Sequence, residues 1–334
     1  MMTRLVLLFS AALMTASAAD YHVIGKIPVG GEGGWDYVTV DSEARRLYAS
    51  HATHVVVIDL DSEKVVGDIP DTQGVHGIAI APKLNRGWVS NGRSNNVTVF
   101  DLKSLKASGQ IATGQNPDAI LYDPKSENVF VFNGRSKDAT VIGAKDGAVK
   151  ATIPLGGKPE FPAVDGKGKL WVNIEDTNEI AELDTVKASV SKRYKLEGCD
   201  EPSGLAADLE HGRLFSVCHN KVMAISDPAA GKVVATVPIG TGTDGAVFDA
   251  GRKLAFSSNG EGNLTVVGEK GGKYAVVATV PTQQSARTVG VDQKTHKLYL
   301  PAAQFGPAPA ATAQTPRPRP AMVPDTFCIL VVSQ

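Results

Sequence analysis

The chain of 334 residues contains 34 Lys and Arg, 35 Asp and Glu and 7 His, which gives a formal net charge of −1. Nucleic-acid-binding proteins usually carry a basic cluster or stripe, and none stands out here, so the composition disfavours a nucleic-acid partner. The length allows either two ordinary domains or one large repeat fold.

The first 19 residues predict a secretory signal peptide. Arg4 supplies a short basic start, residues 5–14 form an apolar core, and small residues occupy positions 16–19. This is the layout of a cleavable export signal. The apolar core is too short to span a bilayer comfortably, although an uncleaved membrane anchor is the alternative. We therefore expect a periplasmic or secreted protein that begins near residue 20 and has no membrane span after cleavage.

The stretch IPVGGEGGWDYVTVD at residues 27–41 allows two interpretations. A glycine-rich loop can cradle phosphate when it leads into the N-terminus of a helix. Here a run of apolar and β-branched residues follows, as in a strand. We therefore expect a loop between two strands, whose glycines allow a tight turn with positive φ.

A repeat of about 42 residues runs through the rest of the chain. Each unit contains four short runs rich in Val, Ile, Thr and aromatic residues, separated by Gly, Asn, Asp and Pro, which is typical of strands joined by tight turns. Four-stranded units of roughly 40–45 residues are the blades of a β-propeller, and seven is a usual number of blades. The seven units begin at Ile27, Ile69, Ile111, Ile153, Lys195, Val237 and Val280.

The two ends of the chain predict how the ring closes. Residues 21–26 (YHVIGK) match the fourth strand of a blade, whereas residues 326–334 (TFCILVVSQ) match a third strand. The N-terminal strand would therefore complete the last blade and remove two open sheet edges. The predicted fold is all-β, with residues 20–334 forming a single seven-bladed β-propeller of four-stranded blades.

Two repeats, RLYASHATHVVVIDLDSEKVV at 46–66 and RGWVSNGRSNNVTVFDLKSLK at 86–106, resemble those of the YVTN-repeat family, the YncE-like exported seven-bladed β-propellers. The resemblance covers essentially the whole mature chain and implies the propeller fold. It implies no single activity, because propellers of this kind include binding proteins, lyases and lactone hydrolases.

One polar position precedes each predicted innermost strand. Within a blade the chain runs one way along the first strand and back along the second. The loop before the first strand and the loop between the second and third strands therefore lie on the same face of the ring. The seven side chains should therefore converge around the axis, either at a ligand site or at a water-filled channel mouth. They are Asp36, His76, Asp118, Glu160, Ser203, Asp244 and Arg287. Trp35, next to Asp36, and Asn259 are further candidates for contact with a ligand.

Four of these ring residues are carboxylates, and like charges held close together raise one another's pKa unless a cation or Arg287 compensates. A divalent cation such as Ca²⁺, which prefers oxygen ligands, would suit them. His76 is a candidate metal ligand or general base. The expected metal ligands are Asp36, Asp118, Glu160 and Asp244, with Asn91, Asn133, Asn173 or Asn259 nearby.

Loops on the same face carry further candidates. The tetrapeptide NGRS occurs at residues 91–94 and 133–136, and Asn-Gly is common in turns between strands. Arg93 and Arg135 are then either solvated or able to grip an anionic ligand. His51 and His54 are expected to be exposed loop residues, with a transition-metal site as the alternative.

Cys199 and Cys218 belong to the same blade, where antiparallel pairing brings the start of the innermost strand beside the end of the second strand. We predict a disulfide, as expected in an oxidising compartment. The alternative is a metal site formed by the two thiols with Asp200 and His219. Cys328 is expected to be a buried apolar side chain.

Residues 305–324 (FGPAPAATAQTPRPRPAMVP) interrupt the last blade with a Pro- and Ala-rich insertion. Its composition predicts extended or polyproline-like chain on the mouth face, as a lid, a docking strip or a loose solvated loop. The function predicted overall is that of an exported binding or scaffold protein, with a small molecule or a protein bound at the mouth. The alternative is a metal-assisted hydrolase or lyase of lactonase type that uses the axial carboxylates and His76.

Overall fold

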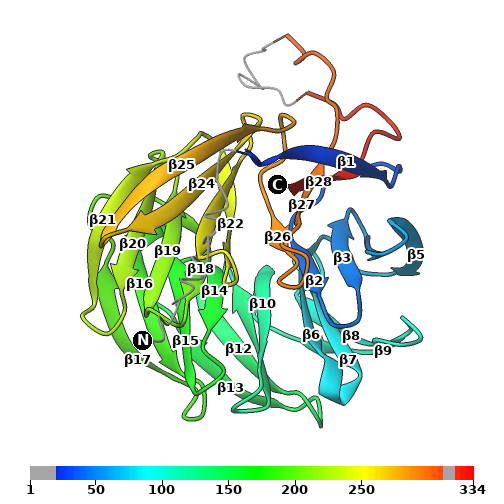
Figure 1. Ribbon diagram of the computed structural model, residues 1–334. Helices are drawn as coiled ribbons and strands as arrows, with labels where there is room; N and C mark the ends of the chain where they lie inside the picture. Colours follow the sequence, from blue (N-terminus) through cyan, green and yellow to red (C-terminus); the bar gives the residue numbers. More distant parts are fainter. Residues whose placement is uncertain (1–19, 311–319) are drawn as a thin grey trace, which may run out of the picture.

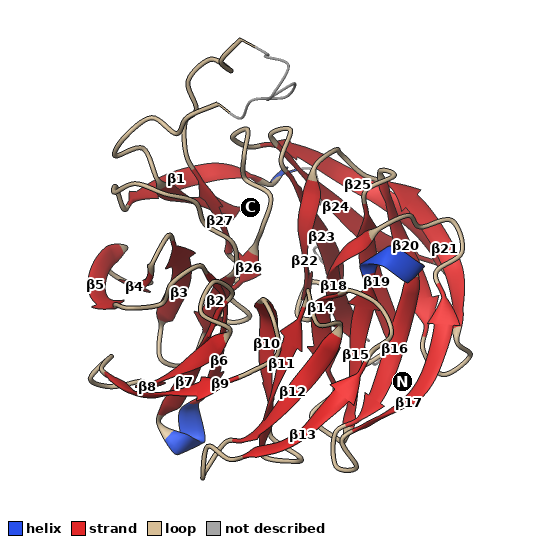
Figure 2. Ribbon diagram, turned by 180° about the vertical axis from the view of Figure 1, so that it is seen from behind, coloured by secondary structure: helices blue, strands red, loops and turns tan. Residues whose placement is uncertain are grey.

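The computed structural model describes residues 20–310 and 320–334, which form a ring of seven four-stranded antiparallel sheets around an axis (Figure 1). The predicted signal peptide at 1–19 lies outside the described residues. The fold is an all-β propeller, as predicted. Helical segments in the described part are short 3₁₀ turns such as η2 (Pro82–Leu84) and η3 (Glu175–Thr177), and the view from behind shows none covering the ring (Figure 2). No helix among these residues is long and apolar enough to cross a membrane.

The first four blades each consist of four consecutive strands that run from the axis to the rim. Blade 1 contains β2 (Val38–Asp41), β3 (Arg46–His51), β4 (His54–Asp59) and β5 (Lys64–Ile69). Blade 2 contains β6 (Val75–Ala81), β7 (Arg86–Asn91), β8 (Asn96–Asp101) and β9 (Ala107–Ala112). Blade 3 contains β10 (Pro117–Asp123), β11 (Asn128–Asn133), β12 (Asp138–Gly143) and β13 (Val149–Pro154). Blade 4 contains β14 (Pro159–Val164), β15 (Lys169–Ile174), β16 (Glu179–Asp184) and β17 (Ser189–Lys195).

The remaining blades follow the same order until the last one, whose outer strand comes from the N-terminus. Blade 5 contains β18 (Pro202–Asp208), β19 (Arg213–Cys218), β20 (Val222–Asp227) and β21 (Lys232–Pro238). Blade 6 contains β22 (Thr243–Asp249), β23 (Leu254–Asn259), β24 (Asn263–Lys270) and β25 (Lys273–Pro281). Blade 7 contains β26 (Gly290–Val291), β27 (Leu298–Ala302), β28 (Cys328–Ser333) and β1 (His22–Pro28).

The hydrophobic core lies between neighbouring blades. Third strands such as β8 are buried on both faces, which explains their continuous apolar sequences, whereas outer strands such as β21 alternate between exposed and partly buried residues. At one blade-to-blade interface, Phe256 and Leu264 of blade 6 pack with Leu300 and Leu330 of blade 7. Each blade therefore needs both neighbours to bury its two faces.

An aspartate closes the turn after five of the innermost strands. Its buried carboxylate accepts hydrogen bonds from backbone N–H groups two or three residues later, which is the geometry of an Asx turn. This explains why the apolar runs of the repeat end in Asp. The five residues are Asp41, Asp123, Asp208, Asp249 and Asp292.

The ring closes through β1, as predicted. This strand pairs antiparallel with β28, with Val23 opposite Val332 and Ile27 opposite Ile329. Ile27 is buried, and it packs with Ile329 and with Leu47 of blade 1. Closure therefore fixes blade 7 and its interface with blade 1 at the same time.

The predicted disulfide is present between Cys199 and Cys218, whose Cα atoms lie 5.5 Å apart. It joins the loop before β18 to the end of β19. Because both thiols are bonded to each other, they do not form the alternative metal site with Asp200 and His219. Cys328 begins β28 and is buried, as predicted.

Candidate functional site

β-Bulges turn the ring side chains toward the axis. In five innermost strands the register with the second strand breaks where the ring residue lies. A bulge takes a side chain out of the regular alternation of a strand, and bulges are common beside functional sites. The residues so placed are His76, Asp118, Glu160, Ser203 and Asp244, while Asp36 and Arg287 come shortly before β2 and β26.

Serine hydroxyls near the ends of second strands hold the backbone at these positions. Ser50 Oγ accepts a hydrogen bond from the backbone N–H of Asp36 at 2.8 Å. Ser90 Oγ accepts one from Gly77 N–H, also at 2.8 Å, and donates to the carbonyl of Asp118 in the next blade. The two serines occupy equivalent places in the repeat, one residue before the strand ends. That equivalence is the sequence signal from which their role could have been predicted.

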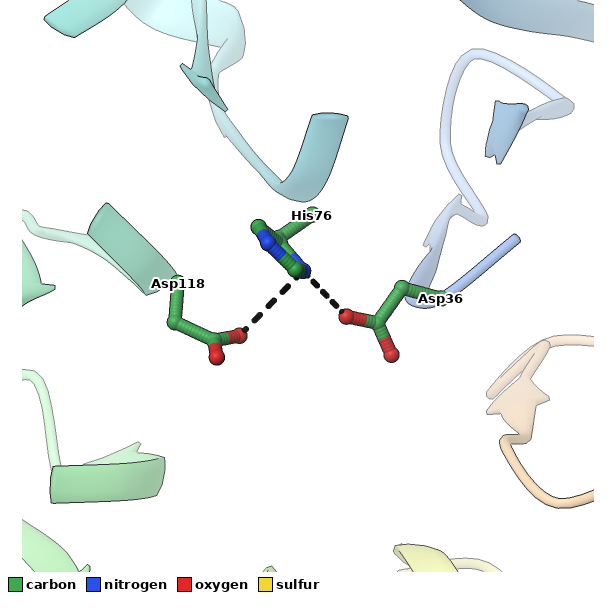
Figure 3. Close-up of side chains that lie close together, drawn as sticks. All are labelled: Asp36, His76 and Asp118. Carbon is green, nitrogen blue, oxygen red and sulfur yellow. Dashed lines mark hydrogen bonds and ion pairs between the residues drawn. The ribbon is translucent and has the colours of Figure 1, made fainter. Parts of the chain in front are cut away.

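His76 lies between two carboxylates (Figure 3). Its Nδ1 is 2.6 Å from Asp36 Oδ2 and 3.7 Å from Asp118 Oδ1. Burial alone would lower the pKa of His76, but the hydrogen bond to Asp36 and the charges of both carboxylates outweigh it and raise the pKa to about 9. The imidazole is therefore protonated at neutral pH and donates to Asp36. It must first lose that proton to act as a general base or a metal ligand.

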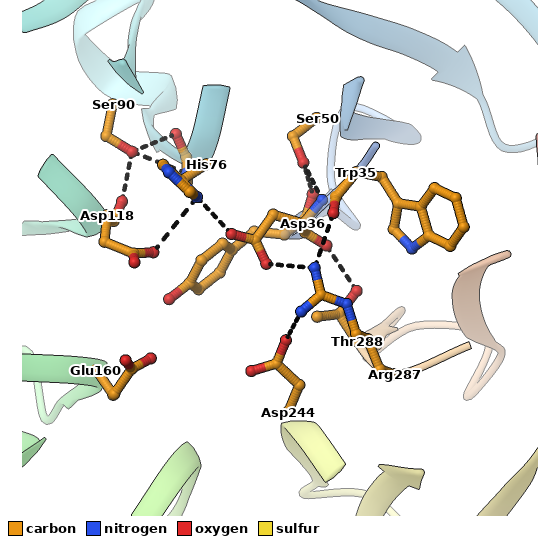
Figure 4. A network of polar contacts seen from close by, with 12 residues as sticks. Trp35, Asp36, Ser50, His76, Ser90, Asp118, Glu160, Asp244, Arg287 and Thr288 are labelled. Carbon is orange, nitrogen blue, oxygen red and sulfur yellow. Dashed lines mark hydrogen bonds and ion pairs between the residues drawn. The ribbon is translucent and has the colours of Figure 1, made fainter. Parts of the chain in front are cut away.

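Arg287 links two further carboxylates (Figure 4). Its Nη1 donates to Asp244 Oδ2 at 2.5 Å, and its Nη2 lies 3.6 Å from Asp36 Oδ1. The same Nη2 donates to the carbonyl of Trp35 at 3.0 Å. Ser203 Oγ donates to the other oxygen of Asp244 at 2.8 Å. Arg287 therefore compensates part of the acidic ring and ties blade 7 to blades 1 and 6.

Lys158 compensates the opposite side of the ring. Its Nζ lies 2.7 Å from Glu160 Oε1 and also pairs with Glu175. Neither Lys158 nor Glu175 belongs to the predicted ring. Lys158 comes two residues before Glu160, and side chains two apart in an extended chain point to the same side, so the period of two could have identified it. Glu175 begins η3 directly after β15, and no pattern in the sequence indicates that it reaches the ring.

These side chains line a cavity of about 450 Å³ at the axis, which we call the axial cup. Its size lies in the usual range of small-ligand sites, roughly 300–1,000 Å³. Tyr37 lines the cup and stacks on Phe161 from the opposite side of the ring, with 4.2 Å between ring centroids. The charged and titratable residues that line the cup are Asp36, His76, Asp118, Lys158, Glu160, Glu175, His219, Asp244 and Arg287.

Three carboxyl groups of the axial cup have raised pKa values. Burial, followed by the charge of Asp118, raises the pKa of Glu160 to about 9 although Lys158 opposes the shift. Burial is also the main cause that raises the pKa of Asp118 to about 6, against the effect of His76. Burial raises the pKa of Asp244 despite its ion pair with Arg287. The cup thus holds more acidic groups than its own cations compensate.

The four carboxylates predicted as metal ligands are not brought together as one set. Asp244 is held by Arg287 and Glu160 by Lys158, and Figure 4 shows Glu160 apart from the others. Within residues 20–310 and 320–334, one group of side chains could hold a metal ion. It consists of Asp36, His76 and Asp118, whose ligand atoms all lie within 4.8 Å of one another. An imidazole with two carboxylates suits zinc or another transition metal better than Ca²⁺, which prefers a larger set of oxygens.

The predicted asparagines lie inside the blades and not in the axial cup. Asn259 is fully buried, and its amide donates to Asn263 Oδ1 at 2.7 Å and to Thr265 Oγ1 at 3.0 Å. The expectation that Asn259 faces a ligand is therefore corrected, because its side chain joins the second and third strands of its own blade. The other three are equally buried and hydrogen-bonded within the fold: Asn91, Asn133 and Asn173.

Other predicted side chains of the mouth face lie outside the cup. Arg93 and Arg135 are exposed on the loops after β7 and β11, and neither lines the cup, so an anion-binding role remains a prediction. His51 is not an exposed loop residue as expected. It is buried and stacked on Phe327 with ring centroids 4.3 Å apart, and burial lowers its pKa to about 4. His54 is partly exposed beside it.

The described ends of the insertion stand at the outer edge of the ring and not over the axis, as both views show (Figures 1 and 2). Phe305 and Met322 form an isolated antiparallel bridge at its base. Phe305 also lies against Trp35, with 6.0 Å between ring centroids. These aromatic residues line a second cavity of about 960 Å³, which we call the rim cavity. Residues 305–310 and 320–324 do not line the axial cup, and the role of the insertion as a lid or docking strip remains a prediction.

Comparisons with known proteins support the fold. No protein-family model matches the chain, and no curated protein is significantly similar to it in sequence. The structure is similar to hydrazine synthase from Kuenenia stuttgartiensis, over 80% of this chain and 92% of that one, with 17% identity and a TM-score of 0.70. It is also similar to the WD40 β-propeller domain of Doa1, over 94% of this chain and 97% of that one, with 11% identity and a TM-score of 0.70. Likeness at such low identity shows a shared propeller fold and carries no activity with it.

Proposed function

We propose that this chain is an exported β-propeller binding protein of the YVTN-repeat type, whose axial cup takes a small, positively charged ligand. The observation that carries the proposal is the lining of the cup, where five carboxyl groups meet only two permanent cations and two imidazoles. An added ammonium group or metal ion favours the ionised forms of Asp118, Glu160 and Asp244 and so lowers their raised pKa values. An anionic ligand would be repelled by the excess of carboxylates over cations in the lining of the cup.

Asp118 and Glu160 are the groups that we expect to bind the cation. The nearest cation to Asp118 is His76, at 3.7 Å, which is too far for a hydrogen bond. Figure 4 shows the carboxyl groups of Asp118 and Glu160 on the same side of the cup. Tyr37 also lines the cup, with its ring stacked on Phe161. Two carboxyl groups beside an aromatic residue are a suitable environment for an amine.

Export is supported by two independent features. The N-terminal sequence has the layout of a cleavable signal peptide. The disulfide between Cys199 and Cys218 is of a kind that persists in oxidising compartments such as the periplasm. The resemblance of the repeats to exported YVTN propellers agrees with both.

A second candidate function, metal-assisted hydrolysis or lyase chemistry, is favoured by the group formed by Asp36, His76 and Asp118. A metal ion held by three protein ligands retains open positions at which it can polarise a carbonyl or activate water. His76 would then serve as a ligand and not as a base. Because the imidazole must lose its proton to bind a metal, we expect this affinity to increase with pH.

Titration calorimetry with ethylamine, Ca²⁺, Mn²⁺ and Zn²⁺ at about pH 8 tests the proposal. We expect ethylamine or one of the metal ions to bind the wild-type protein. Asp118→Asn should weaken that binding about tenfold or more, because it removes a charged hydrogen-bond partner. Binding should also weaken as the pH falls through about 6, where Asp118 becomes protonated.

Asp146→Asn is the matched control, because Asp146 lies exposed in blade 3 and pairs with Lys150 far from the cup lining. It should leave the affinity unchanged. Zinc or manganese bound in a one-to-one ratio and lost in His76→Ala would favour the second candidate. If none of the four probes binds, or if Asp118→Asn binds as well as the wild type, a cation site in the axial cup is excluded.

A further inference from the structure

The ion pairs of the axial cup form two separate networks, and each network begins and ends with a carboxylate. In the first network each side chain pairs with the next, in the order Asp244, Arg287, Asp36, His76 and Asp118 (Figure 4). One guanidinium and one imidazolium thus serve three carboxylates. Even with His76 protonated, this network lacks one positive charge when its acids are ionised.

The second network is shorter and has the same shortage. Lys158 lies between Glu160 and Glu175, and within the described part of the chain no other cation pairs with either carboxylate. His219 does not supply the missing charge, because it pairs with Glu201, a carboxylate that does not line the cup. When all their acids are ionised, the two networks together therefore lack two positive charges.

The two networks approach each other at Asp118 and Glu160, which come from the neighbouring blades 3 and 4 and lie on the same side of the cup in Figure 4. The charge of Asp118 helps to raise the pKa of Glu160, so the two carboxyl groups interact across the gap between the networks. This gap lies within one cavity, because both residues line the axial cup.

Both carboxyl groups have unused acceptor atoms. The only cation paired with Asp118 among residues 20–310 and 320–334 is His76, at 3.7 Å, which is too far for a hydrogen bond. Glu160 is only 8% exposed, and of its two oxygens only Oε1 pairs with Lys158, at 2.7 Å. Polar groups buried to this degree are normally satisfied. The facing ends of the two networks therefore point to a ligand that brings hydrogen-bond donors.

Two missing charges that belong to two networks favour two cationic groups in one ligand. A Ca²⁺ ion carries both charges but takes roughly 6–8 oxygen ligands, more than the two facing carboxyl groups offer. An ammonium group has three donors and forms charge-assisted hydrogen bonds with carboxylates. The cup of about 450 Å³ has room for a short alkyl chain with an ammonium group at each end.

We propose that the axial cup binds a short alkyl diamine, with one ammonium group at Asp118 and the other at Glu160. This inference rests on the proposed function, which places a cation at these carboxyl groups, and it adds that the ligand carries two charges. In the empty cup a proton on Glu160 replaces the second cation, since burial and the charge of Asp118 raise the pKa of Glu160 to about 9. Binding of the diamine then releases that proton.

Calorimetry with putrescine and butylamine at about pH 8 tests the inference, because the two probes have the same carbon chain and differ by one ammonium group. Putrescine should bind the wild type at least about tenfold more tightly, because it forms one more charge-assisted hydrogen bond. Glu160→Gln, which retains the shape of the protonated side chain, should remove most of this preference and change butylamine binding little. Asp118→Asn should weaken the binding of both probes.

Titration of the wild type in phosphate and in Tris buffer measures proton release, because these buffers differ in their enthalpy of ionisation. Putrescine should release about one proton at about pH 8, since Glu160 is mostly protonated before binding and ionised afterwards. Butylamine should release less, and the Glu160→Gln variant should release almost none with either probe. Equal proton release by the two probes in the wild type would contradict the second ammonium site.

Glu127→Gln is the matched control for Glu160→Gln, because Glu127 also pairs with a lysine at 2.7 Å but is exposed and does not line the cup. It should alter neither titration. Equal affinities for the two probes, or a preference for putrescine that persists in Glu160→Gln, would overturn the diamine and leave the proposed cation site intact. Binding of neither amine would also overturn the diamine, and it would overturn the cation site too unless a metal ion binds in a manner that depends on Asp118.

Discussion

His76, Asp118 and Glu160 all affect stability in the same direction as the pH changes. The pKa of His76 is raised to about 9, so its contribution to the free energy of unfolding is complete below about pH 6.5 and is lost as the pH rises through about 9. The raised pKa values of Asp118, about 6, and Glu160, about 9, mean that the folded state favours their neutral forms. Their contributions are therefore also lost as the pH rises. The cup without a ligand is most stable when protonated.

Asp118→Asn should stabilise the ligand-free protein at about pH 7.5, because it removes a buried carboxylate that is costly to ionise. We expect the free energy of unfolding to rise by about 1–3 kcal/mol, less than the whole linkage effect because His76 loses one of its two carboxylate neighbours. Near pH 4 the carboxyl is already neutral, so the gain should vanish. Urea unfolding at the two pH values measures both. A loss of stability at about pH 7.5 would show that Asp118 is a net stabilising ion-pair partner.

Inner strands of neighbouring blades lie close together next to the ring residues. A Cβ atom built at Gly204 would lie 2.6 Å from the backbone nitrogen of Ala246 and 2.7 Å from the carbonyl oxygen of Asp244. Both atoms belong to β22, so the backbone of the neighbouring blade would have to shift. Gly204 thus lets blades 5 and 6 meet at the position that presents Asp244 to the cup.

Gly204→Ala should lower the free energy of unfolding by about 1–3 kcal/mol, as overpacked core substitutions do. The matched control is Gly109→Ala in the outer strand β9, where an added Cβ meets nothing within 4 Å and φ is not positive. That change should be neutral or stabilise by up to about 1 kcal/mol, because alanine restricts the unfolded chain. Urea unfolding of both variants provides the comparison. Equal effects would mean that the inner strands have room to separate.

The whole ring depends on a contact between the two ends of the described chain. The pairing of β1 with β28 joins residues about 300 positions apart, so it is the least local contact of the fold and carries a loop-closure entropy cost. Ile27 lies at this junction with 1% of its surface exposed, whereas Ile24 in the same strand is 45% exposed. The two residues allow the closing contact to be tested within one strand.

Ile27→Ala should reduce the free energy of unfolding by about 2–5 kcal/mol through the lost burial and the cavity it leaves. Ile24→Ala should change it by less than about 0.5 kcal/mol, as is usual for surface substitutions. Denaturant unfolding gives both values, and hydrogen exchange should show faster exchange of β28 amides in Ile27→Ala alone. Similar small effects of both substitutions would mean that the seam of the ring contributes little to stability.

The sequence by itself determined the all-β class, seven blades, ring closure by residues 22–28 and the disulfide between Cys199 and Cys218. These features follow from periodicity and strand alternation, which are local properties repeated along the chain. The repeat spacing also predicted that seven polar residues lie around one axis. It could not show which of them pair, because equivalent positions look alike in sequence.

Only the tertiary structure decided the chemistry of the site. Charged groups interact over a few ångströms, so the pairing of Asp36 with His76 and of Asp244 with Arg287 depends on where each bulge aims its side chain. For the same reason the sequence did not predict that Lys158 lines the cup and pairs with Glu160. It also did not predict that the side chain of Asn259 lies inside its blade. The stack of His51, Phe327 and Trp35 joins residues from opposite ends of the chain. Repeat spacing carries no information about such contacts, because they arise only when the ring has closed.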